Sequence, residues 1–353
     1  MALKLAGMRI FIHLVRNSTR HRSAMPGLAV LVLGSISATV WGQTAAPIVL
    51  KVDLENVVGY WDDGVDFSKL GSNPAVTTPV ATRRVFQAQV QIGDIVAVNG
   101  RPTNGTFVMN ARNLNLGTTI AAGQSIADAT RTGIAQYTFE FLRSDGASVG
   151  TIFASSLNGG TAATGTPAGT TQANGAVVGG SGAYWGAQGQ VASTSANPPV
   201  RAASFSEDTA TRRINGGGKI QYVLQITVPE RPSVVSTSTG PAIVHASNNQ
   251  LVTGSNPAQA GETLVLYARG LGPASGTAIG QPFPSAPLAV VVAPVDVTVN
   301  GASATVSYAG GYPGALDGYQ VNFTLPAGLA SGPASLQLAS SWIPGDAVNL
   351  PIQ

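Results

Sequence analysis

The 353-residue sequence contains no cysteine, and this absence excludes disulfide bonds, thiol nucleophiles and metal sites built from cysteine. Charged residues are also scarce, at 10% of the chain, whereas glycine alone supplies 43 residues. Long amphipathic helical patterns are hard to find. The composition therefore predicts an all-β protein of many short strands and tight turns, which depends on a packed core because it has no covalent cross-links.

Residues 1–42 predict a secretory signal peptide. Five basic residues and no acid precede or flank the apolar run "LAVLVLGSISATVWG", and small residues precede Gln43. The apolar core from Leu28 to Val40 is short for the ~30 Å of hydrocarbon in a bilayer, so we expect cleavage near Gly42 rather than a membrane anchor. No later segment reaches about 18 uninterrupted apolar residues. We therefore expect a secreted or cell-envelope protein with no transmembrane segment after signal removal.

The charge of the expected mature chain argues against a nucleic-acid partner. Five of the 19 bases and none of the 16 acids lie within the leader, which leaves 14 bases against 16 acids. No basic stripe remains to follow a phosphate backbone. The doublets Arg83-Arg84 and Arg212-Arg213 are interpreted as solvated strand ends.

Alternation with a period of two residues predicts strands along most of the chain. In "RVFQAQVQI" one face is apolar and the other carries glutamines, which predicts a strand that buries its apolar face. The segment "IAQYTFEFLRSDGASVGTIFASSL" predicts two strands joined by a hairpin turn at Asp145-Gly146. The apolar face of "RVFQAQVQI" consists of Phe86, Ala88, Val90 and Ile92.

A change of composition at "PERPSVVSTSTGP" predicts a linker between two domains. We expect a first domain over residues 43–228, a linker over 229–240 and a second domain over 241–353. The second domain contains about seven short strands with regular turns, one of them at Asn300-Gly301. This spacing predicts a small β-sandwich.

The stretch "AVVGGSGAYWGAQGQV" (residues 176–191) raises the question of a nucleotide-binding or catalytic loop. The G-x-S-x-G pattern of a nucleophile elbow is absent, because Ala183 follows Gly182. A dinucleotide fingerprint would need a helix after the glycines, and the residues that follow alternate like a strand. We therefore expect a hairpin with its turn at Gly179–Gly182, Tyr184 and Trp185 at the end of the sheet, and the next strand from Gly186.

The same stretch resembles the glycine signature G-G-[ST]-G-x-[FY]-x-G-A-x-G of dirigent proteins and allene oxide cyclase-like barrels. The resemblance continues upstream through "GTIFASSL", "YTFEFLRSDGASVG" and "GTFVMNARNL" and covers residues 50–228. It implies an eight-stranded antiparallel β-barrel with a central cavity. Members of this family bind hydrophobic or phenolic small molecules, and plant members steer radical coupling or cyclise an unstable epoxide. The matched residues are structural glycines, so the resemblance assigns no catalytic residue.

Residues 241–353 resemble the C-terminal domain found in secreted acidobacterial (Solibacter-type) proteins. The matching segments include "AIVHASNNQLVTGSNPAQAGETLVLYARGLGP" and "VTVNGASATVSYAGGYPGALDGYQVNFTLPAGLASG". The segment "SSWIPGDAV" departs from the usual glycine-rich turn. The resemblance implies an Ig-like β-sandwich that serves as an accessory module of a bacterial extracellular protein.

Aromatic, acidic and basic residues of the first domain are the candidates for contact with a ligand. The acidic group in "YWDDGVDF" is open to two interpretations, a calcium or acid–base loop and a plain polar turn. The EF-hand pattern is absent from it, and we expect no metal. The candidate ligand-binding residues are Tyr60, Trp61, Asp62, Arg84, Tyr137, Glu140, Tyr184 and Trp185.

Glu140 is open to two placements, because alternation puts it opposite Tyr137, Phe139 and Phe141. If these aromatic residues line the barrel, Glu140 faces solvent. If they face outward, Glu140 points into the lumen and becomes a candidate acid–base group. His245 is the only histidine after the leader. A single histidine in the second domain builds neither a two-histidine metal site nor a triad with the first domain, so we interpret it as structural.

Three functions remain open from the sequence. We expect first a secreted bacterial protein whose barrel binds a small hydrophobic or aromatic ligand, with no cofactor. The second is a cyclase-like, isomerase-like or dirigent-like enzyme that acts in the barrel lumen. The third is a structural or adhesive envelope protein with a filled barrel. Association of copies through the barrel is a further expectation of the family resemblance.

Overall fold

The computed structural model describes residues 46–63, 85–115, 130–160, 175–203 and 206–353. The predicted signal peptide, Asp66 and Arg84 lie outside these residues. The described chain consists of strands, with only a 3₁₀ turn η2 (Thr209–Thr211) and a short helix α2 (Arg212–Asn215) between them. Within these ranges no helix has the length and apolarity needed to span a bilayer.

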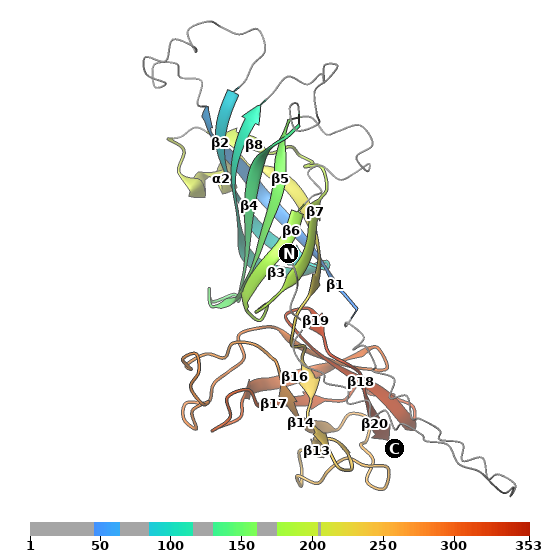
Figure 1. The fold of residues 1–353 in the computed structure, drawn as a ribbon. Helices are drawn as coiled ribbons and strands as arrows, with labels where there is room; N and C mark the ends of the chain where they lie inside the picture. Colours follow the sequence, from blue (N-terminus) through green and yellow to red (C-terminus); the bar gives the residue numbers. More distant parts are fainter. Residues whose placement is uncertain (1–45, 64–84, 116–129, 161–174, 204–205) are drawn as a thin grey trace, which may run out of the picture. The chain divides into compact units, whose positions relative to one another are not determined.

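The first eight long strands close into an antiparallel β-barrel, as predicted (Figure 1). Closure follows from β1, which pairs with β2 along one side and with β9 along the other. A short strand β8 (Arg201–Ala203) pairs in parallel with the end of β1. The barrel strands are β1 (Ile48–Asp63), β2 (Val85–Val98), β3 (Arg101–Asn115), β4 (Thr130–Leu142), β5 (Ser148–Gly160), β6 (Gly175–Gly182), β7 (Gln188–Ser193) and β9 (Gly218–Thr227).

The two ends of the barrel differ in the length of their connections. At one end, which we call the hairpin end, β2–β3, β4–β5 and β6–β7 are joined by two to five residues. At the other, the long-connection end, β1–β2, β3–β4, β5–β6 and β7–β9 are joined by 14 residues or more. The turn predicted at Asp145-Gly146 uses left-handed backbone, with φ of 87° at Gly146. The β2–β3 turn does so as well, with φ of 52° and 74° at Asn99 and Gly100.

Alternation along β2 is confirmed, but the buried face is the opposite of the predicted one. Gln89 is 5% exposed, whereas Val90 is 37% exposed. Gln89 pairs with Ala111 of β3, which is also buried, so the glutamine face of β2 points into the barrel at this level. The prediction assumed that the apolar face of β2 is the buried one. It is wrong because the lumen is partly polar and a β-barrel leaves apolar side chains on its outer wall.

The glycine-rich stretch forms the predicted hairpin, although its turn lies later in the chain. Gly179 and Gly180 belong to strand β6, and the turn covers residues 183–187. A bulge opposite Phe153 and Ala154 lets β6 continue beyond the expected end. The left-handed glycines of the turn are Gly182 and Gly186, with φ of 60° and 72°.

The remainder of the chain forms a second, curled sheet. Strand β16 holds it together, because residues 302–304 pair with β15 and residues 305–311 pair with β17. Nine strands share this sheet: β10 (Ser233–Val234), β13 (Ile243–His245), β14 (Thr263–Arg269), β15 (Val295–Val299), β16 (Ala302–Gly311), β17 (Tyr319–Thr324), β18 (Gly332–Ser340), β19 (Ile343–Pro344) and β20 (Val348–Ile352). Strand β10 lies within the predicted linker and pairs with β14. Two further short strands, β11 (Ser236–Thr237) and β12 (Gly240–Pro241), pair with each other.

Candidate functional site

A layer of four aromatic side chains fills the middle of the barrel. Tyr222 of β9 lies 5.1 Å from Phe107 of β3 and 5.1 Å from Phe139 of β4, measured between ring centroids. Tyr137 of β4 lies 5.9 Å from Tyr222. Strands β4 and β9 are separated by three strands in either direction around the barrel, so these contacts cross the lumen. We call Phe107, Tyr137, Phe139 and Tyr222 the aromatic layer.

Small side chains line the lumen next to the aromatic layer, on the side of the long-connection end. Each residue of this row pairs directly with the next across neighbouring strands, and all are buried. Tyr137 pairs with Ala154, one inward position closer to the hairpin end. Glycine, alanine and serine are smaller than the aromatic rings, although Val191 packs against Gly175, where a Cβ atom would lie 2.4 Å from its Cγ1. The small-residue row consists of Gln89, Ala111, Ala135, Ser156 and Gly175.

Three polar side chains lie at this level of the lumen. The hydroxyl of Tyr137 lies 2.9 Å from the hydroxyl of Ser156. The amide nitrogen Nε2 of Gln89 is buried and has no hydrogen-bond partner in the described structure. A buried donor without a partner costs about 1–3 kcal/mol, so this arrangement is unfavourable unless another group accepts the hydrogen bond.

The tyrosines of the aromatic layer stay protonated at neutral and mildly alkaline pH. Burial raises the pKa of Tyr137, although the hydrogen bond with Ser156 partly opposes the shift. Burial also raises the pKa of Tyr222, and the nearby phenol of Tyr137 adds to this effect. Both side chains therefore present neutral hydroxyl groups, which can donate or accept hydrogen bonds.

The lumen carries no charged group in the part that the structure describes. Among the described residues, Arg212 and His245 are the buried side chains able to carry charge, and neither lies on a barrel strand. General acid–base catalysis needs a group that changes protonation near the working pH. The described lumen offers hydrogen-bonding groups and apolar contact.

Glu140 faces outward, and this settles the choice that the sequence left open. Phe139 and Phe141 on either side of it are fully buried in the barrel, whereas Glu140 is partly exposed. Among the predicted ligand-binding residues on strands whose side chains the structure describes, Tyr137 is therefore the one that lines the lumen. The interpretation of Glu140 as a lumenal acid–base group is wrong.

Tyr60 and Trp185, which the structure describes, do not gather in the lumen. The hydroxyl of Tyr60 donates to the backbone oxygen of Glu207, 3.3 Å away. Trp185 is 66% exposed in the β6–β7 turn. The side chains of Trp61 and Asp62 lie outside the described residues, as does Arg84.

Tyr184 closes the hairpin end of the barrel, as expected for this position. Its ring is completely buried and lies 5.0 Å from that of Phe141. Its hydroxyl donates to the backbone oxygen of Ser341, 3.4 Å away. Burial strongly raises the pKa of Tyr184. Tyr184 therefore packs inside the hairpin end of the barrel, whereas the neighbouring Trp185 does not.

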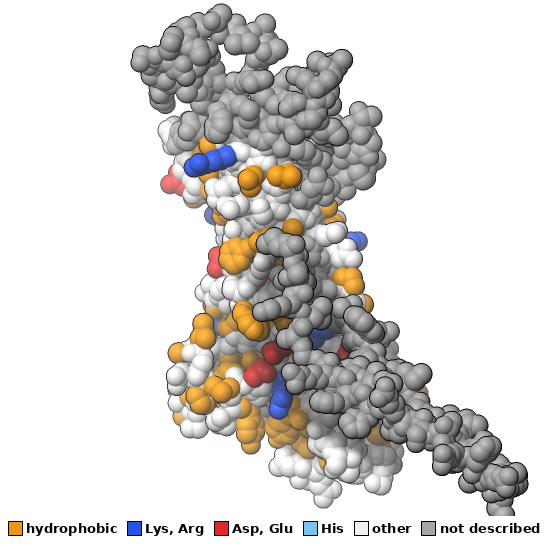
Figure 2. Space-filling model, viewed as in Figure 1, with side chains coloured by type: hydrophobic (Ala, Val, Ile, Leu, Met, Phe, Trp, Pro, Cys, Tyr) orange, Lys and Arg blue, Asp and Glu red, His pale blue; other side chains and the backbone are white. Residues whose placement is uncertain are grey.

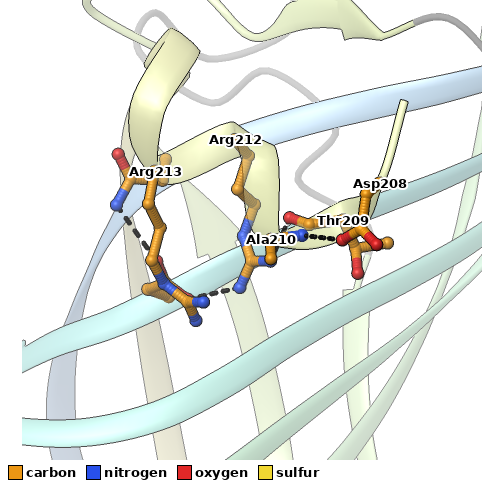
Figure 3. Close-up of polar contacts among 7 residues, drawn as sticks. Asp208, Thr209, Ala210, Arg212 and Arg213 are labelled. Atoms are coloured by element: carbon orange, nitrogen blue, oxygen red, sulfur yellow. Dashed lines mark hydrogen bonds and ion pairs between the residues drawn. The ribbon is translucent and has the colours of Figure 1, made fainter.

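A charged cluster lies on the outer wall of the barrel (Figure 3). Arg212 and Arg213 of helix α2 both donate to the carboxylate of Asp94 on β2, and Arg213 does so at 2.7 and 3.0 Å. The amide of Asn56 adds a hydrogen bond of 3.0 Å. The prediction of a solvated strand end at Arg212-Arg213 is wrong, because the doublet lies on a helix and Arg212 is buried. The cluster fastens the β7–β9 connection to the barrel.

His245 in the second sheet has a structural environment, in line with its interpretation from the sequence. Its Nδ1 lies 2.6 Å from a carboxylate oxygen of Glu262, and its Nε2 lies 3.3 Å from the backbone oxygen of Asn256. Both ring nitrogens are thus engaged within the second sheet.

Sequence reasoning missed Gln89, Ser156 and Tyr222. The signal for Gln89 was present in "RVFQAQVQI", since a strand with one glutamine face and one apolar face can bury either one in a barrel that holds polar groups. Tyr222 lies on a strongly predicted strand, "KIQYVLQITV". Its place opposite β4 depends on closure of the barrel, which alternation does not reveal.

Comparison with protein-family models, with curated proteins and with solved structures finds no match to this chain.

Proposed function

We propose that the barrel binds one small, mainly apolar or aromatic molecule at the small-residue row, and that this molecule accepts a hydrogen bond from Gln89. The observation that carries the proposal is the buried, unpartnered Nε2 of Gln89. An acceptor such as a carbonyl oxygen would satisfy this donor, while the ring system of the ligand would rest on the aromatic layer. Small barrels hold either packed side chains or one small ligand, and this lumen is packed in its middle and lined by small residues next to it.

The resemblances of residues 50–228 and 241–353 to known families support the proposal, and we include them in it. The glycine stretch fits membership of the allene oxide cyclase and dirigent-like barrels, whose members bind hydrophobic or phenolic molecules. The second sheet fits an Ig-like accessory domain of a secreted bacterial protein. Export rests on the leader pattern of residues 1–42.

Catalysis in the lumen, as a cyclase or isomerase, is the weaker alternative. It would have to depend on the neutral hydroxyls of Tyr137 and Tyr222, because the described lumen holds no carboxylate or histidine. A structural barrel is the other alternative, and the aromatic layer favours it. This alternative provides no hydrogen-bond acceptor for the buried amide nitrogen of Gln89.

A matched pair of ligands tests the proposal by isothermal titration calorimetry. 1-Acetonaphthone and 1-ethylnaphthalene have nearly the same shape, but only the first offers a carbonyl acceptor. The wild-type protein should bind acetonaphthone with 1:1 stoichiometry and about tenfold more tightly, which corresponds to one hydrogen bond of about 1.4 kcal/mol. The variant Gln89→Leu should lose this preference. The control Gln225→Leu, at an exposed position of β9, should keep it.

A second variant tests the place of binding. Ala135→Leu adds three carbon atoms to the small-residue row and should abolish binding of both ligands. Circular dichroism and thermal unfolding establish that the variant is folded, since overpacking of this kind costs about 1–3 kcal/mol. If neither ligand binds to the wild type, and native mass spectrometry of protein from its own host finds no small molecule, the lumen is a structural core and the proposal fails.

Association of copies through the barrel is also proposed, on the basis of an outer apolar patch. Ile134 and Leu157 pair across β4 and β5, and Phe153 and Val178 lie on the outer face of β5 and β6. All four are more than 40% exposed, and Figure 2 shows hydrophobic side chains on the outer surface of the barrel. Light scattering should find a dimer or larger species that Phe153→Glu converts to monomer. A monomeric wild type at micromolar concentration would rule this out.

A further inference from the structure

A pocket of about 380 Å³ opens on the second sheet, away from the barrel lumen. Its walls come from strand β14, from the turn at residues 312–318 and from the segment before β11. This volume lies within the ~300–1,000 Å³ typical of small-ligand sites. The pocket is lined mainly by Val235, Tyr267, Arg269, Tyr312, Leu316 and Asp317.

Two tyrosine rings form perpendicular walls of the pocket. The rings of Tyr267 and Tyr312 lie 5.9 Å apart between centroids, with an angle of 78° between their planes. Tyr312 is 48% exposed and Leu316 is 63% exposed, so large apolar surfaces face solvent here. Exposed aromatic and aliphatic side chains gathered in one hollow favour a binding site over ordinary surface.

Backbone hydrogen bonds fix the chain around the pocket, so the backbone that carries the two tyrosines is in place without a ligand. The amide of Tyr312 donates to the oxygen of Gly318 at 2.7 Å, and the amide of Ala315 donates to the oxygen of Tyr312 at 3.0 Å. The amide of Val235 donates to the oxygen of Tyr267 at 2.9 Å. Such preorganisation lowers the entropy cost of binding.

Polar groups at the pocket are free to bind. In the described structure no hydrogen bond or ion pair engages the guanidinium of Arg269 or the hydroxyls of Tyr267 and Tyr312. Asp317 accepts a hydrogen bond from the amide of Gly270 at 3.1 Å and also interacts with the hydroxyl of Tyr319, and its carboxylate has further acceptor sites. The pocket therefore offers donors and acceptors side by side with flat apolar surfaces.

This combination selects the chemistry of the ligand. A purely apolar ligand would remove water from Arg269 and Asp317 without replacing its hydrogen bonds, which is costly. An anionic ligand would be attracted by Arg269 but repelled by Asp317. A neutral sugar ring has hydroxyl groups that donate to a carboxylate and accept from a guanidinium, and an apolar C–H face that packs on an aromatic ring.

We propose that this pocket binds a sugar unit of a neutral polysaccharide. The pocket is open to solvent, so a sugar chain can continue beyond it. The second sheet would then anchor the protein to a glycan, independently of any ligand in the barrel.

Calorimetric titration of the full chain with neutral hexasaccharides tests this site. The probes are cellohexaose, laminarihexaose and maltohexaose, and hexagalacturonate serves as the acidic counterpart. At least one neutral hexasaccharide should bind with a millimolar or lower Kd. Tyr312→Ala should weaken this binding tenfold or more, Arg269→Ala should weaken it severalfold, and Tyr312→Phe should retain most of it.

Trp185→Ala is the matched control, because Trp185 is an exposed aromatic residue outside the pocket. It should leave binding unchanged, and unfolding temperatures should show that Tyr312→Ala and Arg269→Ala are folded. The inference is overturned if no neutral hexasaccharide binds, if only hexagalacturonate binds, or if Tyr312→Ala binds as tightly as the wild type.

Discussion

The backbone oxygen of Tyr184 lies so close to Gly180 that a Cβ atom on Gly180 would be 2.2 Å from it. The neighbouring Gly179 has open space at the same position. The two glycines are adjacent in strand β6, yet only one of them is required for the close approach of the β6–β7 turn.

Gly180→Ala should therefore lower the free energy of unfolding by about 3 kcal/mol, because the backbone of the turn must shift to relieve the clash. Gly179→Ala is the control and should change stability by less than about 0.5 kcal/mol. Urea unfolding of both variants measures the difference. Equal effects at the two positions would show that the turn does not close on β6 as described.

Phe139→Ala should destabilise the protein by about 3–5 kcal/mol, because it opens a cavity in the aromatic layer. Phe153→Ala on the outer face of β5, where the side chain is 42% exposed, should cost less than about 1 kcal/mol. Thermal and urea unfolding give both values. The reverse order would mean that the assignment of inner and outer faces is wrong.

Gln89→Leu should stabilise the ligand-free protein, by about 1 kcal/mol, since it replaces a buried amide with an unpartnered donor by an apolar side chain. The same variant should lose the ligand preference described above, so stability and binding would change in opposite directions. Unfolding of protein stripped of small molecules by refolding measures the effect. A loss of stability would indicate that the amide has a partner in solution.

Asp94 should make stability depend on pH in the acid range. Burial by itself raises the pKa of this carboxyl, but hydrogen bonds from Arg213, Asn56 and Arg212 outweigh it and leave the pKa below its ordinary value of 3.8. The stabilisation by Asp94 is thus present in full when the pH is above the ordinary pKa, and it is lost as the pH falls through the lowered pKa of the folded protein. Asp94→Asn should cost about 2 kcal/mol at pH 7, and this cost should shrink at pH 3.

The exposed pair of Glu55 and Lys219 provides the control for this prediction. Glu55→Gln should cost less than about 1 kcal/mol at pH 7, because exposed ion pairs contribute little. A cost for Asp94→Asn that is the same at both pH values would show that the charge of Asp94 is not what matters.

Stability should also fall at alkaline pH because of the buried tyrosines. Burial raises the pKa of Tyr137, Tyr184 and Tyr222 above the ordinary value of 10.0. A group with a raised pKa in the folded state contributes stability that is complete below its unfolded pKa and is lost as pH rises beyond it. The unfolding temperature should therefore decrease above pH 10. Absorbance at 295 nm should show part of the tyrosine ionising only on unfolding, and complete ionisation of the folded protein would contradict this.

Local patterns in the sequence predict strands and hairpin turns well, because these are local, whereas the closed barrel was expected only from the family resemblance. Asp145-Gly146 and Asn300-Gly301 form the expected turns, and Asn300 and Gly301 both have the left-handed backbone of such turns, with φ of 51° and 80°. The turn expected at Gly179–Gly182 lies later in the chain, because β6 contains a bulge where it pairs with β5. The glycine-rich stretch alone does not reveal that pairing.

The candidate site is harder to predict, because it depends on which face of each strand points inward. Tyr137 was identified, yet alternation gives the same pattern for both orientations and left Glu140 undecided. The buried glutamine at position 89 reverses the usual relation between polarity and exposure. Contacts between Tyr222 and the residues of β3 and β4 arise only when distant strands close into a ring.

The direct pairing of Ile48 with Ile226 brings the first and last barrel strands together. The chain consequently enters and leaves the barrel at neighbouring points of the hairpin end. A domain built in this way can be inserted into a surface loop of a host protein without separating the two ends of that loop. It can also be circularly permuted, by joining residues 48 and 226 through a short bridge and opening the chain at Asn99-Gly100. The barrel thus meets the geometric condition for both rearrangements, because its two ends lie on adjacent, paired strands.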